Sequence, residues 1–283
     1  MTTKVLFVHA LTPLHAGIGS GTDVIDLPIA REKSTGLPYL PGSSIKGSLR
    51  SVVTATNPMV AKAMFGPETR DASEHAGAVQ FSDAYLLAMP IRSLAGMFAW
   101  VTSPYILRRL ARDLQLAGNA TPAIPTLQDT QVAVPPAITK LRVQGQKAVF
   151  EDIDLNIVES NDVGQWLTVL TPLITHIDGN FIAERFCVVS DDVLSFLLNT
   201  ATEVRARVRL NDDKTVQTGA LWYEESLPSE TLLVGIVNIT PNSKTNMPTA
   251  DMLGALHHVA QNLVQFGGKT TTGHGFCRMM ITK

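Results

Sequence analysis

Three short segments of the chain combine residue types that could bind phosphate or act on it. The first, FGGKTTTGHGF at residues 266–276, places four glycines, three threonines, Lys269 and His274 between two phenylalanines. Glycine lets backbone N–H groups approach an anion closely, and the lysine and threonines add further donors. A nucleotide-binding P-loop opens a helix, whereas this run would leave a helix and enter a strand, so no P-loop is predicted. Phosphate binding is the favoured interpretation, and helix capping by Gly267 with turn geometry is the alternative.

The second segment, LPYLPGSSIKGSLR at residues 37–50, places Ser43, Ser44, Lys46 and Arg50 at or just inside a predicted helix N-terminus. That end of a helix presents free N–H groups and the positive pole of the helix dipole, and it therefore binds anions readily. Either serine is a suitable helix cap. The alternative interpretation is an ordinary capped helix with a solvated lysine.

The third segment is an acidic loop after the first predicted strand. In GTDVIDLPIAREK, residues 21–33, Asp23 and Asp26 could each hold Mg²⁺ through a carboxylate oxygen, although a loop aspartate is more often a turn former. His15, at the start of the same long loop, could transfer a proton near neutral pH or could be structural. Glu224 lies in LWYEESLP at the base of a predicted hairpin, and by itself it would be interpreted as a solvated charge.

Other chemistries find little support in the sequence. His257, His258 and His274 lack zinc-ligand spacing, and no G-x-S-x-G motif predicts a serine nucleophile. Cys187 and Cys277 lie far apart, which favours a reduced intracellular protein. Neither a signal-peptide pattern nor the roughly 18–20 apolar residues of a membrane helix are found, so we expect a cytoplasmic protein with no membrane partner. The net charge of −2 neither predicts nor excludes nucleic-acid binding, since a local basic surface would suffice.

The elements that would hold these segments alternate between strand and helix. With 283 residues, 45% of them hydrophobic, the chain can bury a sizeable core in one elaborated domain or two small ones. Hydrophobic periodicity predicts strand 5–12, helix 44–56, strand 79–87, strand 231–239, helix 251–266 and strand 275–282. This β-α-β and β-α-β order predicts an α+β, ferredoxin-like fold.

Further helices and a basic hairpin are predicted between the two halves. Helices are expected at residues 103–118 and 190–202, the second one capped by Ser190, with a strand-like stretch at 147–158. In residues 203–228, EVRARVRLNDDKTVQTGALWYEESLP, the first arm alternates arginine with apolar residues and NDD is typical of a turn. This stretch therefore predicts a β-hairpin with a basic first arm.

Taken together, these motifs resemble those of a known family. TPLHAGIGSG, VIDLPIAREKSTGLPYLPGSSIKGSLR and GGKTTTGHGFCR resemble motifs of the RAMP superfamily of CRISPR proteins. SPYILRRLARDL, FCVVSDDVLSFLLNTATEVRARVRL and GALWYEESLP are similar to the backbone subunits of type III-B (Cmr) effector complexes. The resemblance extends over nearly the whole chain and is weakest near residues 119–145.

The resemblance implies a single RAMP domain over residues 1–283. Its palm would be a modified ferredoxin-like (RRM-like) domain built from residues 1–100 and 231–283, with helical and loop insertions at about 101–200 and a β-hairpin thumb at about 201–230. Copies would stack head to tail as a filament on a CRISPR guide RNA, with complementary target RNA and the other subunits of the type III-B complex as partners. The guide would be held through its backbone while base pairing reads the target, which would be cut at intervals of about six nucleotides.

The same resemblance implies an endoribonuclease in which Asp26, in the D-x-P-I-x-R-E context, is the essential aspartate and His15 and Glu224 are further catalytic residues. Mg²⁺ or Mn²⁺ held by Asp26 would assist attack of the target's own 2′-OH on the adjacent phosphate. The implied guide-binding residues are Ser44, Lys46, Arg50, Gly268, Lys269, Thr270, Thr271 and Thr272. Two alternatives stay open: a purely structural RNA-binding subunit without nuclease activity, and a guide-processing endonuclease that uses His15.

Overall fold

A large mixed sheet organises the chain. The computed structural model describes residues 1–20, 25–67, 75–241 and 247–282. Twelve strands of the described residues form this sheet, ten of them in the order β13-β14-β1-β12-β4-β5-β9-β6-β8-β7, while β2 pairs with β4 and β3 with β12. The strands are β1 (Thr2–Ala10), β2 (Tyr39–Leu40), β3 (Val79–Phe81), β4 (Ala84–Arg92), β5 (Phe98–Thr102), β6 (Gln131–Val134), β7 (Lys147–Phe150), β8 (Ile153–Glu159), β9 (Phe186–Val189), β12 (Leu232–Ile239), β13 (Val264–Gln265) and β14 (Phe276–Ile281).

The centre of this sheet is the antiparallel group β14-β1-β12-β4. β1 lies between β14 and β12, with Phe7 opposite Met280 on one side and Val234 on the other. Because β1 is covered on both faces, it reads as an almost continuous apolar run, and its residues 5–10 are all buried. The buried end of β1 therefore fixes the position from which the following loop begins.

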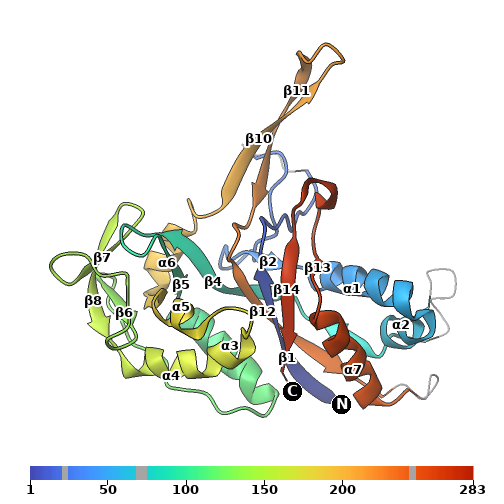
Figure 1. The fold of residues 1–283 in the computed structure, drawn as a ribbon, viewed down its shortest axis with the longest axis horizontal. Helices are drawn as coiled ribbons and strands as arrows, with labels where there is room; N and C mark the ends of the chain where they lie inside the picture. Colours follow the sequence, from blue (N-terminus) through green and yellow to red (C-terminus); the bar gives the residue numbers. More distant parts are fainter. Residues whose placement is uncertain (21–24, 68–74, 242–246, 283) are drawn as a thin grey trace.

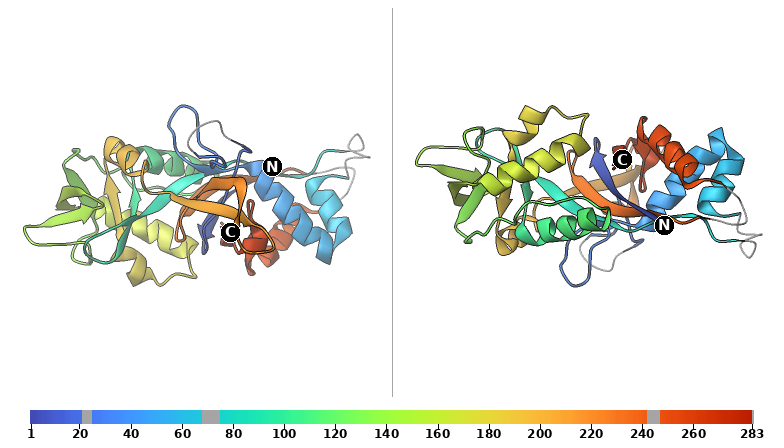
Figure 2. Two further views of the ribbon diagram at one scale, coloured as in Figure 1. Left: turned by 90° about the horizontal axis from the view of Figure 1, so that it is seen from above. Right: turned by 90° about the horizontal axis from the view of Figure 1, so that it is seen from below.

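Helices cover both faces of these central strands. α7 packs on β12 and β14, and α3 packs on β1, β4 and β12 from the opposite side (Figure 2). The α-helices are α1 (Gly42–Thr56), α2 (Pro58–Phe65), α3 (Pro104–Leu116), α4 (Asn161–Leu170), α5 (Gly179–Ala183), α6 (Asp191–Leu197) and α7 (Thr249–Ala260), and the short 3-10 helices are η2 (Thr171–Leu173) and η3 (Thr270–Thr272). Within the described residues, no helix is long and apolar enough to cross a membrane.

The predicted β-hairpin with a basic first arm is confirmed. β10 (Glu203–Leu210) and β11 (Val216–Ser226) form a sheet of their own that projects away from the rest of the molecule (Figure 1). Arg205 lies opposite Glu224 in the register, and Arg207 lies opposite Trp222. We call this hairpin the thumb. Its base, where β11 returns to the main sheet, lies beside the loop after β1 and the glycine-rich loop.

Several predicted boundaries are wrong. α7 ends at Ala260 rather than near residue 266, because Val264 and Gln265 form β13, which pairs with β14 at the edge of the sheet. Gly267 therefore follows a strand, and its positive φ of 76° serves a loop rather than a helix cap. Hydrogen bonding at the edge of the sheet outweighs the helical periodicity of this stretch.

The N-terminus of α1 also differs from the prediction. α1 begins at Gly42 after Pro41, and neither Ser43 nor Ser44 caps it through a side-chain hydrogen bond. The carboxylate of Asp83 accepts the Gly42 N–H instead, at 2.8 Å. The predicted strand 79–87 is likewise two strands, β3 and β4. The strand-like stretch at 147–158 is the pair β7 and β8, and the insertion also contains β6 and β9, which were not predicted. By contrast, Ser190 caps α6 as predicted.

Candidate active site at the base of the thumb

His15 lies buried between the thumb and the glycine-rich loop. Its Nδ1 donates a hydrogen bond to the backbone carbonyl of Glu225 at 2.7 Å, and its own carbonyl accepts the Gly268 N–H at 2.9 Å. Since a carbonyl can only accept, Nδ1 carries the proton of the neutral ring, and Nε2 keeps its lone pair. A Cβ on Gly17 would lie 2.4 Å from this Nε2, and one on Gly267 would lie 2.4 Å from the His15 carbonyl oxygen. Both glycines are therefore required for the packing of His15.

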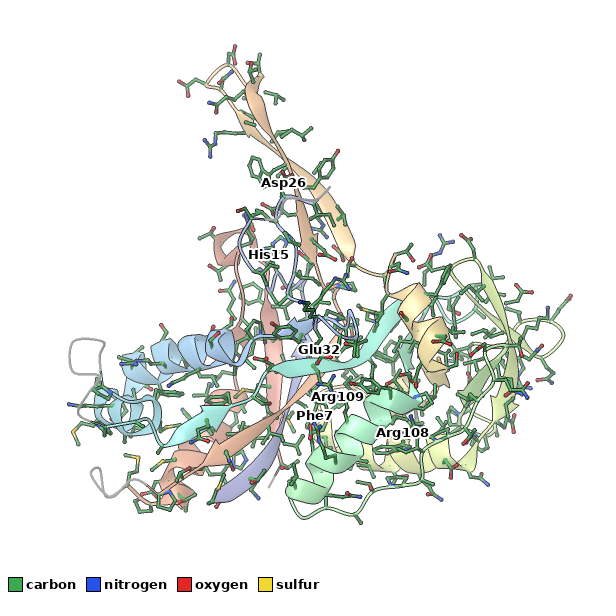
Figure 3. All side chains as sticks on the ribbon, turned by 180° about the vertical axis from the view of Figure 1, so that it is seen from behind. Phe7, His15, Asp26, Glu32, Arg108 and Arg109 are labelled. Atoms are coloured by element: carbon green, nitrogen blue, oxygen red, sulfur yellow. The ribbon has the colours of Figure 1, made fainter. Side chains whose placement is uncertain are left out.

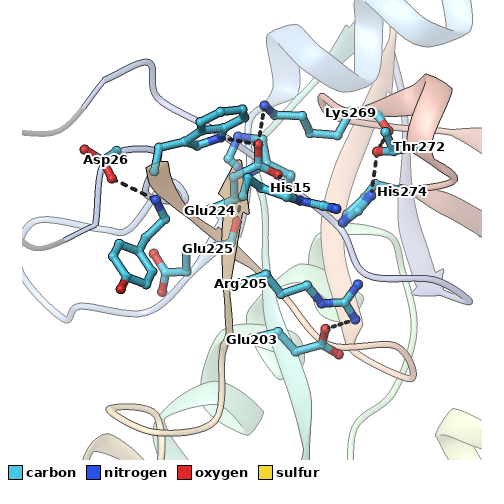
Figure 4. Close-up of polar contacts among 12 residues, drawn as sticks. His15, Asp26, Glu203, Arg205, Glu224, Glu225, Lys269, Thr272 and His274 are labelled. Atoms are coloured by element: carbon cyan, nitrogen blue, oxygen red, sulfur yellow. Dashed lines mark hydrogen bonds and ion pairs between the residues drawn. The ribbon is translucent and has the colours of Figure 1, made fainter. Parts of the chain in front are cut away.

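Asp26 lies against the thumb strand β11. Its Oδ2 accepts the backbone N–H of Tyr223 at 2.7 Å, while the side chain is exposed (Figure 4). The next residue, Leu27, exchanges backbone hydrogen bonds with Tyr223 and Glu225, so a short ladder holds this part of the loop on β11. The other carboxylate oxygen of Asp26 has no protein partner among the described residues and points to a position where a ligand could reach it. Asp23, the other acidic candidate, lies outside the described residues.

Glu225 fixes the Asp26 loop to the thumb. Its buried carboxylate accepts hydrogen bonds from the Ile29 N–H at 3.1 Å, from Arg31 Nη2 at 2.6 Å and from the Thr202 hydroxyl at 2.9 Å. This buried charge is paired and fully hydrogen-bonded, which is the condition for its burial to be tolerated. The sequence analysis missed this role. Strand alternation could have indicated this role, because it places Glu224 and Glu225 on opposite faces of β11.

A second contact holds the far end of the same loop. Glu32 lies beside Arg109 of α3 (Figure 3), and the two form an ion pair at 2.7 Å. The Arg109 guanidinium stacks on the ring of Tyr85, 4.0 Å from its centroid. The Tyr85 hydroxyl in turn donates to the buried carboxylate of Asp113 at 2.9 Å. The loop that carries Asp26 is thus attached to the thumb on one side and to α3 on the other.

Glu224 faces the glycine-rich loop and is surrounded by donors. Its Oε1 accepts from Lys269 Nζ at 2.6 Å and from Trp222 Nε1 at 2.7 Å, and its Oε2 accepts from Arg207 Nε at 3.2 Å (Figure 4). Burial alone would raise the pKa of Glu224, but the hydrogen bonds from Lys269, Trp222 and Arg207 outweigh it and lower the pKa from 4.5 to about 2. Glu224 is therefore an ionised anchor at neutral pH, with no proton to donate.

The glycine-rich loop has an internal framework. Lys269 adopts a left-handed conformation at φ 63°, and η3 follows it directly. The Thr272 hydroxyl donates to the Lys269 carbonyl at 2.8 Å and lies 3.1 Å from His274 Nδ1. His274 is buried, and burial first, followed by the charges of Arg207 and Arg205, lowers its pKa. The sequence left His274 without a role, and the structure makes it a packing partner that supports this loop.

The residues predicted on α1 lie apart from this cluster. α1 contacts β13, the strand that leads into the glycine-rich loop, so the two predicted phosphate-binding segments adjoin. Ser44 and Lys46 are half-buried in its first turns. Arg50 lies further along, and its Nη2 donates to the Pro67 carbonyl at 2.8 Å. The structure thus brings His15, Asp26, Glu224 and Lys269 together at the thumb base and leaves the α1 residues on an adjoining surface.

Comparison with known proteins identifies the family. The sequence model of the RAMP superfamily matches residues 7–278. The chain belongs to the RAMP superfamily. Among RAMP relatives, the CRISPR system Cmr endoribonuclease Cmr4 of Pyrococcus furiosus is 37% identical over 99% of this chain and 96% of its own length. The crystal structure of oligomeric Cmr4 from the same organism matches with a TM-score of 0.80 at 28% identity, over 100% of this chain and 98% of that one.

A second solved structure has the same fold. A chain of the type III-B Cmr-beta complex bound to cognate target RNA matches with a TM-score of 0.76, over 99% of this chain and 97% of that one. At 21% identity this likeness shows the fold alone. The resemblance to type III-B backbone subunits found in the sequence is confirmed by the extensive match to Cmr4.

The ligands that this RAMP site offers to a metal ion are few. No group of three or more His, Cys, Asp or Glu side chains is arranged to hold a metal within residues 1–20, 25–67, 75–241 and 247–282. Glu224 and Glu225 are both engaged by cationic partners, which leaves the free oxygen of Asp26 as the available hard ligand. A single carboxylate fits Mg²⁺ or Mn²⁺ only where substrate phosphate and water complete the coordination shell.

Proposed function

We propose that the chain is the backbone subunit of a type III-B CRISPR effector complex, which binds guide RNA and cleaves complementary target RNA. The observation that carries the proposal is the 37% identity to a Cmr endoribonuclease over 99% of the chain. It is joined by an exposed carboxylate, Asp26, which accepts the Tyr223 N–H at the base of the thumb. Copies would stack head to tail as a filament, with the other complex subunits as partners and the cytoplasm as the place of action. Target cuts would recur at about six-nucleotide intervals, set by the repeat of the filament on the base-paired guide.

The proposed architecture is a modified ferredoxin-like palm with a thumb. The antiparallel order β14-β1-β12-β4, with α1 and α7 as the connecting helices, supports this assignment of residues 1–100 and 231–283. The insertion at about 101–200 extends the sheet from β4 through β5 and β9. The thumb at about 201–230 leaves and rejoins the palm between the insertion and β12.

Guide RNA binding is assigned to the adjoining segments of α1 and the glycine-rich loop. Their proposed phosphate-binding residues are Ser44, Lys46, Arg50, Gly268, Lys269, Thr270, Thr271 and Thr272. These groups offer backbone N–H, hydroxyl and cationic donors, which recognise phosphate without reading base sequence. Binding should therefore weaken strongly as salt increases, because phosphate contacts release counterions.

Target cleavage is assigned to the thumb base. The target's 2′-oxygen would attack the adjacent phosphorus as the bond to the 5′-oxygen breaks, which gives a 2′,3′-cyclic phosphate and a 5′-OH. A divalent ion, when bound at Asp26, would supply charge stabilisation at the phosphorane. Asp26 would hold that ion beside the reacting phosphate, since a bare carboxylate and a phosphate repel each other. The lone pair on His15 Nε2 is the group that could take the proton of the 2′-OH, and water would protonate the leaving 5′-oxygen. Glu224, ionised and held by Lys269 and Arg207, would position the glycine-rich loop for this reaction.

The test is target cleavage by the assembled complex with labelled complementary RNA. The Asp26→Asn variant keeps an oxygen that can accept the Tyr223 N–H but lacks the charge, so we expect intact guide binding and loss of the ladder of cut sites. A wild-type complex that yields no periodic products with Mg²⁺ or Mn²⁺ would favour a purely structural subunit. An isolated monomer that cleaves precursor RNA, and loses this activity in His15→Ala, would favour a guide-processing enzyme.

A further inference from the structure

Trp222 is the one tryptophan of the chain that lies outside the hydrophobic core. The other two, Trp100 and Trp166, are fully buried at 0% exposure. Trp222, on the thumb strand β11, is half-buried, and it belongs neither to the core nor to the apolar side chains packed against it. Tryptophans are on average well buried, so an indole that lies among charged groups instead of in the core favours a binding role.

The indole of Trp222 is held by one edge. Its Nε1 donates to Glu224 Oε1 at 2.7 Å, and the same carboxylate accepts hydrogen bonds from Lys269 and Arg207. This carboxylate therefore fixes the indole relative to the glycine-rich loop. None of the ring-stacking or cation–π contacts in the described part of the chain involves Trp222. The edge of the ring is thus fixed, while its flat faces have no aromatic or guanidinium partner there.

Positive charge surrounds this ring. Trp222 lies opposite Arg207 in the register of the thumb, and Glu224 lies opposite Arg205, so these side chains share one face of the hairpin. Arg207 and Lys269 both pair with Glu224, which leaves one unit of positive charge among the three groups. A basic surface that includes an aromatic ring is typical of proteins that bind single-stranded nucleic acid, because the cations attract phosphates and the ring stacks on a base.

The thumb becomes irregular directly beyond Trp222. The regular pairing of its two strands ends at Val208 and Leu221, and the register shifts before Leu210. Gly219, in the irregular part of β11, has a φ of 74°. Bulges of this kind bend a strand and redirect side chains, and they are over-represented next to functional sites. Trp222 is therefore the last regularly paired side chain on its face of β11.

The ring also lies next to the proposed cleavage site. The following residue on β11, Tyr223, donates its backbone N–H to Asp26 at 2.7 Å, and Leu27 pairs with Glu224 of the same strand. Since adjacent Cα atoms are about 3.8 Å apart, Trp222 begins one residue from the group that holds Asp26. A nucleotide whose base contacts the ring therefore has its phosphates near both Asp26 and the glycine-rich loop.

We propose that Trp222 stacks on one nucleobase of the bound RNA and so fixes the nucleotide at the base of the thumb. Every base has a flat face, so this contact tolerates any sequence. Arg207 and Lys269 attract the phosphates beside the stacked nucleotide. The inference rests on the proposed function, because it names a contact of the same RNA. The stacked base could belong to the guide strand or to the target strand.

Tryptophan fluorescence tests this contact directly, because stacking on a base quenches the emission of an indole. Trp100 and Trp166 are buried and contribute a background that RNA does not reach. We expect RNA to quench the Trp222 emission of the full chain, and we expect no quenching in Trp222→Phe. A guide-length single strand is added first and its complement second. Quenching in the first step assigns the base to the guide, and quenching only in the second assigns it to the target.

The affinity of three variants for the same RNA separates stacking from the hydrogen bond to Glu224. Trp222→Phe keeps a flat ring without the Nε1–H and should bind within about twofold of wild type, while Trp222→Leu should bind at least about fivefold more weakly. Leu221→Ala changes an exposed neighbour on the opposite face of β11 and is the matched control, with unchanged binding. Equal weakening in the phenylalanine and leucine variants would mean that Trp222 acts only through Glu224, and would overturn the proposal.

The fluorescence and the cleavage of target RNA are scored separately. A ladder of cuts that depends on Asp26, without quenching of Trp222 in the RNA-bound chain, overturns this inference and leaves the proposed function intact. Quenching without any cleavage does the reverse. An emission change that follows the concentration of the chain, and not that of RNA, would indicate contact between copies and also overturn stacking on a base.

Discussion

The ionised carboxylate of Glu224 should stabilise the folded chain in a way that depends on pH. In the folded state its pKa is about 2, compared with 4.5 for an ordinary glutamate. A difference of roughly 2.5 pKa units corresponds to about 3 kcal/mol of free energy of unfolding. The Glu224 side chain is only 6% exposed, but its partners Arg207 and Lys269 are 34% and 31% exposed, so solvent screens part of their charge and reduces this contribution. Glu224→Gln should accordingly lower the free energy of unfolding at pH 7 by about 2–3 kcal/mol, since the amide retains weaker neutral hydrogen bonds.

The sign of the pH dependence follows from the lowered pKa. The unfolded chain takes up a proton at Glu224 near pH 4.5, while the folded chain resists protonation until about pH 2. The stabilisation is therefore complete above pH 4.5 and is lost as the pH falls from 4.5 to 2. Because the glutamine variant has no carboxylate to titrate, the difference between wild type and Glu224→Gln should stay constant from pH 7 to about 5.5 and narrow below it.

Urea denaturation of the two proteins at pH 7, 5.5, 4 and 3 measures this difference. Glu203→Gln is the matched control, since Glu203 lies on the same hairpin but is 31% exposed beside an exposed Arg205, and its loss should change stability by less than about 0.5 kcal/mol. A difference for Glu224→Gln that stays the same between pH 7 and pH 3, or one no larger than that of Glu203→Gln, would falsify the reasoning.

Three further variants test the framework of the site. Glu225→Gln leaves Arg31 without its charged partner, so we expect the free energy of unfolding measured with urea to fall by about 2–4 kcal/mol. Target cleavage should also be slower, because the Asp26 loop loses its attachment to the thumb, and unchanged cleavage would argue against that attachment. Lys269→Ala should weaken guide RNA binding equally for all sequences and reduce the slope of log affinity against log salt by about one, and sequence-dependent weakening would contradict a phosphate contact. Gly267→Ala combines a φ of 76° with a Cβ 2.4 Å from a backbone oxygen, so its melting temperature should fall clearly below that of Gly254→Ala, where a Cβ meets no atom.

The local patterns of the sequence were sufficient for most elements of the fold. The apolar run of β1, the punctuated helix α3, the Ser190 cap of α6 and the alternation of the thumb arms each depend on neighbouring residues, so a short stretch contains the information. The family resemblance was likewise a property of the sequence, and the match over residues 7–278 confirmed it. The end of α7 and the strand β13 were not predictable in this way, because the pairing of β13 depends on β14, which follows it after a long loop.

The site itself was decided by the tertiary structure. The sequence predicted separate candidate residues, namely His15, Asp26, Glu224 and Lys269. Only the fold brings these segments from both halves of the chain together at the base of one hairpin. The fold also decides what each carboxylate can do. Three donors keep Glu224 ionised, buried Glu225 attaches the Asp26 loop to the thumb, and Asp26 has one oxygen without a protein partner among the described residues. The protonation state of a side chain, its burial and its access to a ligand depend on neighbours that are distant along the chain but close in space. A linear pattern of residue types does not contain these spatial distances.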